Sequence, residues 1–250
     1  EGMREYLSVA PVHNRCYLEV IGVFQKLLPQ VPLIGAFETA FHQTMAPEAY
    51  TYALPYARQE QYGVRRYGYH GASHAYVAEV LKEKLGNTYR AVSCHLGGSS
   101  SLAAIADGKG VDTSFGLSLQ AGVPQGNRCG DIDPFIIFHM VQKEGWTLEQ
   151  VKEALESQSG LKGISGISGD MRDLERAAAQ GNTRAQLAIR IYCREIARYI
   201  GGYAALLGGI DAIAFTGGVG ENSSLVRGEV LSYFGYLGAT QPGQAEKGRI

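Results

Sequence analysis

Residues 211–223 read Asp-Ala-Ile-Ala-Phe-Thr-Gly-Gly-Val-Gly-Glu-Asn-Ser, and they indicate the class of fold. The apolar run 211–215 is typical of a buried strand, and it leads through the glycine turn 216–223 into a helix expected to reach about Tyr236. A glycine turn between a strand and a helix directs backbone N–H groups at one point, as phosphate-binding turns do. Because such turns often serve packing alone, the segment predicts an α/β fold and leaves its function open.

A second strand and glycine turn lie earlier in the chain. Residues 89–94 predict a strand that runs into His95-Leu96-Gly97-Gly98, and residues 99–105 predict the strand that follows. Asp107-Gly108 is a two-residue hairpin signal, which predicts a third strand over about 111–114. Many of the 33 glycines lie in short clusters beside apolar strands rather than in a linker, which again favours an α/β protein.

Three helices are predicted from their ends and from their apolar spacing. Asp133-Pro134 is a cap followed by a first-turn proline, which begins a helix to about Lys143. Thr147 and Gln150 fit a capping box for a helix that ends near Gly160. Residues 183–207 carry apolar side chains at three- to five-residue steps, so they predict a long, buried helix.

The composition argues against several classes of protein. The 250 residues can form one large domain or two smaller ones, and the net charge of -1 argues against a non-specific polyanion binder. No run of Lys or Arg predicts nucleic-acid binding, and no apolar run approaches the ~20 residues of a membrane span. The four cysteines lie far apart in the sequence, so we expect free, mostly buried thiols and a cytoplasmic protein.

The carboxylate of Glu38 directly follows an apolar, strand-like run of residues. Residues 37–44 read Phe-Glu-Thr-Ala-Phe-His-Gln-Thr, and they follow the strand-like run 32–37. A carboxylate is expensive to bury, so Glu38 is expected to have a partner or a chemical task.

Six segments together resemble the acetate kinases and their propionate-kinase relatives. Four of them carry most of the resemblance: residues 37–44, 65–74 (Arg-Arg-Tyr-Gly-Tyr-His-Gly-Ala-Ser-His), 126–134 (Gly-Asn-Arg-Cys-Gly-Asp-Ile-Asp-Pro) and 215–223. Residues 10–14 and 165–173 agree as well. All six occur in the order of the family and extend over most of the chain.

The resemblance implies an α/β fold of the actin, Hsp70 and sugar-kinase type, with ribonuclease H-like domains around a nucleotide cleft. Residues 1–38 would be the remnant of the N-terminal acyl-substrate domain, and residues 39–250 the second, nucleotide-binding domain, incomplete at its C-terminal end. The family's opening strand and Ser-rich phosphate turn would precede Glu1, and a magnesium-linked Glu would follow Ile250. We therefore expect residues 1–250 alone to turn over poorly, and we expect the protein to be a homodimer.

The resemblance also implies a reaction. Members transfer the γ-phosphoryl group of ATP directly to acetate or another short-chain carboxylate, giving acetyl phosphate and ADP. Such a transfer needs fixed cations and donors around the phosphoryl oxygens. Mg²⁺ (or Mn²⁺) would be bound mainly through ATP oxygens and water, with no protein ligand assigned with certainty in this chain.

The matched positions give each role a residue. Catalysis would fall to Glu38, His70 and Arg128, the last because a guanidinium offers planar, bidentate contact to phosphoryl or carboxylate oxygens. The carboxylate substrate would contact Val12, His13, Tyr69 and Leu119. The nucleotide would contact His95, Gly97, Gly98, Ser99, Asp170, Met171, Arg172, Gly217, Gly218, Val219, Gly220, Glu221 and Asn222.

Several positions depart from the pattern of the family that the chain resembles. Glu38 stands where Asp is usual, Gly98-Ser99 replaces an Asn-Gly pair, and Leu119 occupies a place usually held by Pro. Residues 120–125 also differ from the common sequence. The size of the acyl pocket, and hence the preference for acetate or propionate, stays open.

Other interpretations remain. The chain is alternatively a propionate-preferring kinase, a nucleotide-binding module without transfer activity, or a metal-dependent hydrolase built on its histidines. His74 is expected to cap or pack, and His42 and His139 are expected to be ordinary histidines whose hydrogen bonds are satisfied.

Overall fold

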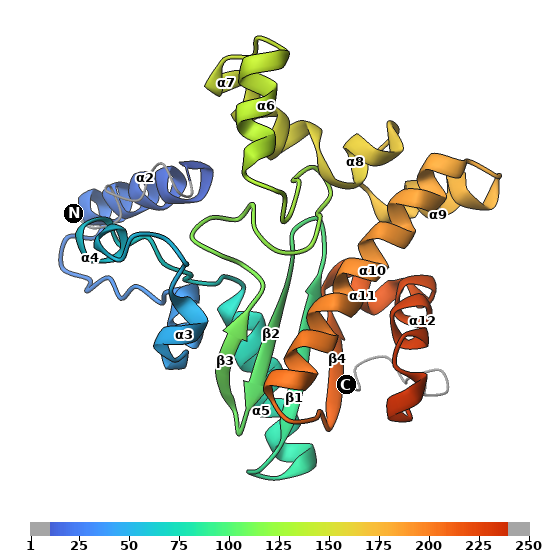
Figure 1. Cartoon of the computed structure of the whole chain (residues 1–250). Coiled ribbons are helices and arrows are strands. Elements are labelled where there is room, and N and C mark those ends of the chain that lie inside the picture. Colours follow the sequence, from blue (N-terminus) through green and yellow to red (C-terminus); the bar gives the residue numbers. More distant parts are fainter. Residues whose placement is uncertain (1–10, 240–250) are drawn as a thin grey trace.

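The computed structural model describes residues 11–239, with side chains from Asn14 onward. At its centre is a four-stranded sheet in the order β3-β2-β1-β4, shown in Figure 1. The strands are β1 (Arg90–Leu96), β2 (Ser100–Ala106), β3 (Lys109–Thr113) and β4 (Ala212–Thr216). The four predicted strands are thus confirmed, with ends displaced by one or two residues.

The sheet is mixed because its two halves are connected differently. β1 pairs antiparallel with β2, and β2 pairs antiparallel with β3 through the turn Asp107-Gly108. Both turn residues have positive φ, 52° for Asp107 and 81° for Gly108, as a primed two-residue hairpin turn requires. β4 pairs parallel with β1, so both of these strands end at the same edge of the sheet. At that edge β1 enters the turn 97–99 and β4 enters Gly217.

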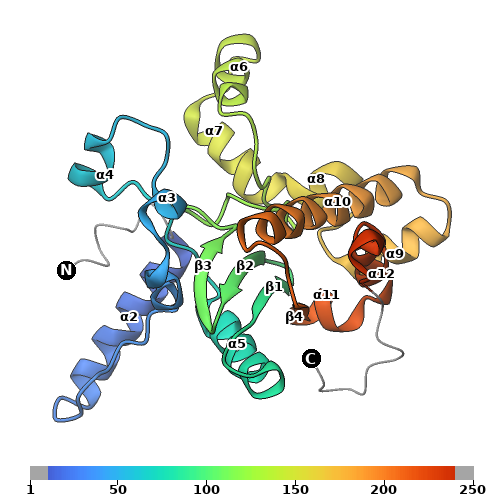
Figure 2. The ribbon, with the colours of Figure 1, turned by 60° about the horizontal axis from the view of Figure 1, so that its bottom comes forward.

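Two helices cover opposite faces of the sheet, as Figure 2 shows for α5 (Gly71–Leu85) and α10 (Thr183–Leu206). Alternate residues of β1 face each helix. Leu96 packs in one buried cluster with Ile196 and Ile200 of α10, whereas Ala91 packs in a second with Val77 of α5. Because successive side chains of a strand point to opposite faces of the sheet, the protein has one hydrophobic core on each face.

Shorter elements surround these layers. They are α2 (Pro11–Leu27), η1 (Glu38–Thr44), α3 (Pro47–Tyr50), α4 (Ala57–Tyr62), α6 (Phe135–Lys143), α7 (Leu148–Glu153), η2 (Ala154–Gln158), α8 (Gly160–Ser165), α9 (Met171–Ala179), α11 (Gly217–Asn222), α12 (Ser224–Ser232) and η3 (Gly235–Leu237).

The predicted starts of α7 and α10 are confirmed, α6 begins at Phe135, one residue after the predicted Pro134, and the predicted end of α7 is wrong. Asp133 Oδ1 accepts the N–H of Phe135, the first residue of α6, at 2.9 Å. Thr147 and Gln150 form the predicted capping box of α7. That helix does not run on to Gly160: α7 ends at Glu153, and the π turn η2 follows. Its backbone is diverted because the carbonyl of Leu155 accepts the N–H of Cys129 at 3.1 Å.

The glycine turn after β4 also differs from its prediction, and the helix predicted to reach about Tyr236 ends at Ser232. Gly217 itself begins a helix, α11, which ends at Asn222, and Ser223 then caps α12 by accepting the N–H of Val226. Only Gly217 takes a turn conformation, with φ of 75°.

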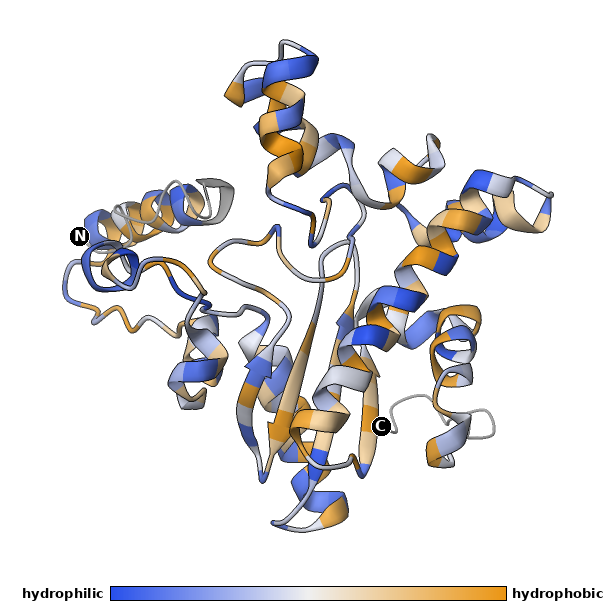
Figure 3. Cartoon of the chain, in the orientation of Figure 1, coloured by the Kyte–Doolittle hydropathy of each residue, from blue (hydrophilic) through white to orange (hydrophobic). Residues whose placement is uncertain are grey.

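Apolar side chains are exposed on α2 and α6, where Figure 3 shows hydrophobic stretches. Examples are Leu27, 72% exposed, and Phe135, also 72% exposed. Between residues 11 and 239 no helix is long and apolar enough to cross a bilayer. The four cysteines are free, and Cys94 and Cys193 are buried, Cys129 is partly buried and Cys16 is exposed.

Candidate functional site

The turn between β1 and β2 holds two of the predicted catalytic side chains. Ser101 Oγ lies 2.8 Å from His70 Nδ1, and Ser99 Oγ accepts a hydrogen bond from Arg128 Nη1 at 3.3 Å. His70 and Arg128 are therefore held by hydroxyls two residues apart, although they come from distant parts of the sequence. This turn, taken together with the first two residues of β2 as residues 97–101, is the centre of the candidate site.

His70 is placed by the start of α5. It precedes the helix in the left-handed conformation, with φ of 55°, which is uncommon outside glycine. Its backbone N–H donates to Glu38 Oε2 at 3.1 Å. Gly71 lies so close to η1 that a Cβ there would stand 1.7 Å from the carbonyl oxygen of Glu38. Close packing of η1 on α5 thus brings the predicted carboxylate to the backbone of the residue that carries the predicted imidazole.

His95 lies beside His70 at the end of β1. The two rings stack with centroids 4.2 Å apart and an interplanar angle of 30°. Ser73 Oγ lies 2.9 Å from His95 Nδ1 and 3.3 Å from Thr216 Oγ1, so a chain of polar contacts links α5, β1 and β4. Burial lowers the pKa of His95, and the nearby carboxylates of Glu38 and Glu221 oppose this shift. The ring is accordingly a neutral hydrogen-bonding group near neutral pH.

His74 and His42 lie behind this pair, inside the protein. His74 is fully buried, with Nδ1 2.9 Å from Ser93 Oγ and Nε2 2.9 Å from Ser101 Oγ. Burial holds its pKa well below the usual range. His42 is also buried, and its Nε2 lies 3.1 Å from the carbonyl oxygen of Tyr69. His74 agrees with its interpretation as a packed histidine, and His139 is exposed on α6. His42 is packed as well, but its buried Nδ1 has no hydrogen-bond partner among the described residues, so the expectation of a satisfied histidine is wrong for His42.

Arg128 lies half-buried in the loop that follows Leu119, one of the predicted acyl-substrate residues. Its Nη1 donates to Gln125 Oε1 at 3.1 Å as well as to Ser99. Burial lowers its pKa and Glu156 opposes the shift, but a guanidinium stays charged under all ordinary conditions. The loop backbone is bonded to the helices behind it, since Leu161 N–H donates to the carbonyl of Gln125 at 2.8 Å and Ser159 N–H to that of Asn127 at 2.9 Å.

Close backbone contacts bring together the glycine turns that are predicted to bind the nucleotide, after β1 and after β4, and the segments around Gly126 and Gly169. Gly126 N–H donates to the carbonyl of Gly98 at 3.1 Å. A Cβ at Gly169 would lie 2.6 Å from the carbonyl oxygen of Gly126, and one at Gly217 would lie 2.6 Å from that of Leu96. Residues 96–98, 126, 169 and 217 therefore form one continuous wall.

The residues after Gly169 begin α9. Asp170 caps this helix by accepting the N–H of Arg172 at 2.9 Å, and it also pairs with the Arg172 guanidinium at 2.5 Å. These bonds lower the pKa of Asp170 to about 2. Arg172 is exposed, whereas Met171 is only 4% exposed and belongs to the α10 core. Met171 therefore has mainly its backbone to offer a nucleotide.

The second nucleotide segment forms α11. Gly218, Glu221 and Asn222 are exposed on it, Val219 packs partly against the core and Gly220 is buried. Asn222 Nδ2 donates to the carbonyl of Gly218 at 2.8 Å.

The predicted acyl-substrate residues are only partly described. Tyr69 donates its hydroxyl to the carbonyl of Leu117 at 3.0 Å, and burial raises its pKa to about 12. The carbonyl of Leu119 accepts Gln125 Nε2 at 2.8 Å. Tyr69 is thus bonded to the backbone of Leu117, two residues before Leu119 in the sequence. The side chains of Val12 and His13 lie outside the described residues, so the structure does not test their contribution.

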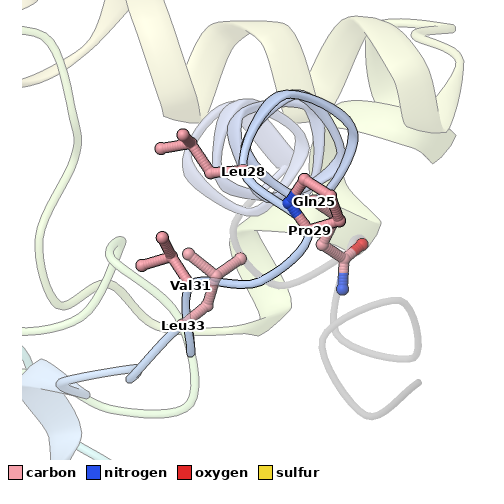
Figure 4. A pocket seen from close by; sticks show the side chains of 5 residues that line it. All are labelled: Gln25, Leu28, Pro29, Val31 and Leu33. Atoms are coloured by element: carbon pink, nitrogen blue, oxygen red, sulfur yellow. The ribbon is translucent and has the colours of Figure 1, made fainter.

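A hollow of about 400 Å³ lies elsewhere, at the end of α2. Gln25, Leu28, Pro29, Val31 and Leu33 line it, as Figure 4 shows. It has no titratable side chain, so it offers no chemistry for group transfer. Within residues 11–239 no group of three or more His, Cys, Asp or Glu side chains is arranged to hold a metal ion.

Sequence reasoning missed the polar residues that support the site. Gln125, Ser101, Ser73 and Thr216 each hold a predicted functional residue or link the elements that carry it. Ser73 and Thr216 lie inside family-like segments, which was a usable signal. Gln125 had none beyond its departure from the common sequence.

Comparisons with known proteins show which proteins the chain resembles. A model described as the acetokinase family matches residues 1–247. The chain is 47% identical over 243 residues to an acetate kinase of Carboxydothermus hydrogenoformans, covering 96% of this chain and 61% of that protein. It is 49% identical over 239 residues to an acetate kinase of Pseudothermotoga lettingae, covering 94% and 59%. The chain therefore spans about 60% of the length of these relatives.

Solved structures show the same fold. The acetate kinase of Porphyromonas gingivalis matches with a TM-score of 0.88 and 41% identity, over 94% of this chain and 60% of that one. A propionate kinase of Francisella tularensis matches with a TM-score of 0.89 and 37% identity, over 94% and 61%. The predicted α/β fold of the actin, Hsp70 and sugar-kinase type is thereby confirmed.

Proposed function

Because the chain belongs to the acetokinase family, we propose that the complete protein transfers the γ-phosphoryl group of ATP to acetate or another short-chain carboxylate. One observation in the structure supports the proposal most directly. The imidazole of His70 and the guanidinium of Arg128 are both held by the turn 97–101, through Ser101 and Ser99. A turn that carries both a donor and a fixed cation suits the charge that develops on a transferring phosphoryl group.

The chemistry divides among these groups. An oxygen of the substrate carboxylate attacks the γ-phosphorus, the bond from this phosphorus to the ADP oxygen breaks, and the products are an acyl phosphate and ADP. Arg128 faces the growing charge on the equatorial oxygens with planar donors, and His70 adds a hydrogen bond. His95, whose pKa is lowered by burial, contributes as a neutral ring stacked on His70.

ATP and a divalent cation complete the proposal. The wall formed by residues 96–98, 126, 169 and 217 offers backbone to the phosphates, and α9 and α11 flank the rest of the nucleotide. Mg²⁺ fits the residues present, because it is usually held by one or two carboxylates together with phosphate oxygens and water. The exposed carboxylate of Glu38 is the side chain that would hold it, directly or through water. The ion would neutralise phosphate charge.

The remaining assignments are also proposals. We propose that residues 1–38 belong to an acyl-substrate domain and residues 39–250 to the nucleotide-binding domain. Tyr69 and Leu119 would border the acyl group, together with Val12 and His13. We propose a cytoplasmic homodimer, as the family resemblance implies.

The test is formation of acyl phosphate by the complete protein, trapped as the hydroxamate, from ATP, Mg²⁺ and acetate or propionate. Arg128→Ala should lower kcat by about 100-fold or more while ATP binding persists. ATP binding without any acyl phosphate on either acid would favour a nucleotide-binding module. The ratio of kcat/KM on the two acids decides between acetate and propionate.

A further inference from the structure

Gln125 is a fully buried amide whose side-chain groups are all engaged. Its exposed fraction is 0%, which is rare for glutamine unless its amide is hydrogen-bonded. Oε1 accepts Ser99 Oγ at 2.8 Å and Arg128 Nη1 at 3.1 Å. Nε2 donates to the carbonyl of Leu119 at 2.8 Å. One side chain thus joins Ser99 of the turn between β1 and β2, the backbone of Leu119, and the predicted catalytic Arg128.

The direction of this amide is fixed by its partners. Rotating it by half a turn would place its NH₂ group against the guanidinium of Arg128, which has only donors. It would also place Oε1 against the carbonyl of Leu119, which has only lone pairs. Only one orientation therefore makes three hydrogen bonds, and in that orientation Oε1 points at Arg128.

Arg128 is held along one edge. Nη1 carries both hydrogen bonds, to Gln125 and to Ser99, and among residues 11–239 neither Nη2 nor Nε makes one. Because the guanidinium is planar, fixing one nitrogen restricts the whole fork. The Nε and Nη2 edge is the one that can receive two oxygens of a phosphoryl group or a carboxylate.

Ser99 completes the triangle. Its only hydroxyl proton goes to Gln125, and its oxygen accepts from Arg128. Ser99 therefore supports the arginine in this arrangement instead of donating to a phosphate. Three of the positions that depart from the pattern of the family (Ser99, Leu119 and Gln125) are in direct contact here.

We propose that Gln125 is a positioning residue for phosphoryl transfer: it fixes the Nη1 edge of Arg128 so that the Nε and Nη2 edge faces the transferring group. The proposal rests on the proposed function, since it assigns a role within that reaction. It makes Gln125 matter for kcat more than for substrate affinity, because an arginine displaced by about 1 Å mainly loses contact with the transition state.

The experiment compares Gln125→Met with Gln186→Met in the complete protein. Methionine keeps the length of the side chain and removes all three hydrogen bonds of Gln125. At Gln186 it removes one amide bond, to the carbonyl of Ala178, away from the site. Gln125→Met should lower kcat by 10- to 100-fold and change KM for ATP and acetate by less than about threefold. Gln186→Met should leave both constants unchanged. A kcat unchanged in Gln125→Met, or a loss confined to KM, would overturn the proposal.

A second readout does not depend on turnover. Rotation about the Cζ–Nη bonds of Arg128, followed by ¹⁵N NMR and assigned by its loss in Arg128→Lys, should be slow in the wild type and fast in Gln125→Met. Equal rotation in both proteins would overturn the proposal even if kcat fell. If Gln125→Met does not fold, Ser99→Ala takes its place, with an expected three- to tenfold loss of kcat and faster rotation, and no change in either would overturn the proposal. A wild-type protein that forms no acyl phosphate would refute the proposed function first, and that outcome is visible before any variant is compared.

Discussion

Glu38 and His70 are joined directly: the backbone N–H of His70 donates to Glu38 Oε2 at 3.1 Å across 32 residues of sequence. His70 is the N-cap residue of α5, so the carboxylate lies at the N-terminus of that helix, where an acidic group is favoured. Oε2 is engaged by the helix, and Oε1 makes no hydrogen bond within residues 11–239. The arrangement leaves half of the carboxylate for a metal ion or its water.

The first prediction separates the charge of Glu38 from its hydrogen bond. Glu38→Gln keeps an oxygen that can accept the N–H of His70 but removes the charge, so kcat for acyl phosphate should fall by about 100-fold with little change in Tm. Glu38→Asp keeps the charge but moves it by about one C–C bond, so kcat should fall by about tenfold. Steady-state hydroxamate assays and thermal melts measure both effects. Wild-type kcat in Glu38→Gln would show that the carboxylate only caps the helix.

The second prediction concerns the contact that holds η1 on α5. Gly71→Ala places a methyl group 1.7 Å from the carbonyl oxygen of Glu38. Since backbone cannot rotate away as a flexible side chain can, η1 and α5 should separate, with a loss of about 3 kcal/mol or more of unfolding free energy. Urea unfolding measures it.

Gly202→Ala is the matched control. Gly202 also lies in a helix, α10, and a Cβ there would meet nothing within 4 Å. The substitution should stabilise the protein by about 0.5–1 kcal/mol, because alanine loses less conformational freedom in a helix. Equal destabilisation by the two variants would contradict the close approach at Gly71.

The third prediction is a pH dependence of stability. Burial lowers the pKa of His42 and His74 in the folded protein, so below about pH 6.5 the unfolded chain binds protons that the folded chain does not. The free energy of unfolding should therefore fall as the pH drops below 6.5, by up to about 1.4 kcal/mol per pH unit for each histidine. Above pH 7 these histidines should contribute no slope.

Urea titrations between pH 5 and pH 8 check this slope. His74→Asn removes one buried titrating group, so its slope should be smaller by about one proton. His139→Gln changes an exposed histidine on α6 and should keep the wild-type slope. A slope in His74→Asn identical to that of the wild type would mean that His74 protonates without unfolding.

Sequence reasoning succeeded where the determinant is local. The capping box of Thr147 and Gln150 and the hairpin at Asp107-Gly108 depend on neighbouring residues only, and both are confirmed. The apolar runs 89–94 and 99–105 likewise located β1 and β2, two strands whose opposite faces are buried against α5 and α10.

It failed where distant backbone competes with local structure. The helix predicted to run to Gly160 ends at Glu153. It ends there because Leu155 and Ser159 form hydrogen bonds with Cys129 and Asn127, which lie in the loop that carries Arg128 (residues 122–131, the arginine loop). The contact between Ser101 and His70 and the triangle around Gln125 were also beyond prediction, since they depend on how the loops pass one another. The family-like segments predicted which residues gather here, but not the hydroxyl and amide groups that hold them.

The last prediction concerns the base of the arginine loop. Asp131 Oδ1 accepts the N–H of Gly122 at 2.8 Å, and the N–H of Asp131 returns a bond to the carbonyl of Gly122, also at 2.8 Å, which closes residues 122–131 into a loop. Tyr199 of α10 donates its hydroxyl to the other oxygen of Asp131. Tyr199→Phe removes this one hydrogen bond between the loop and α10.

A hydrogen bond to a carboxylate contributes roughly 1.5–3 kcal/mol, and less where water reaches it, so Tyr199→Phe should cost about 1–2 kcal/mol of unfolding free energy. Because the loop carries Arg128, kcat should also fall, by about three- to tenfold. Tyr236→Phe, at a side chain 76% exposed, is the control and should change neither quantity. Urea unfolding and the hydroxamate assay measure the two effects. A Tyr199→Phe protein that is less stable but has wild-type kcat would show that the arginine loop keeps its geometry without its attachment to α10.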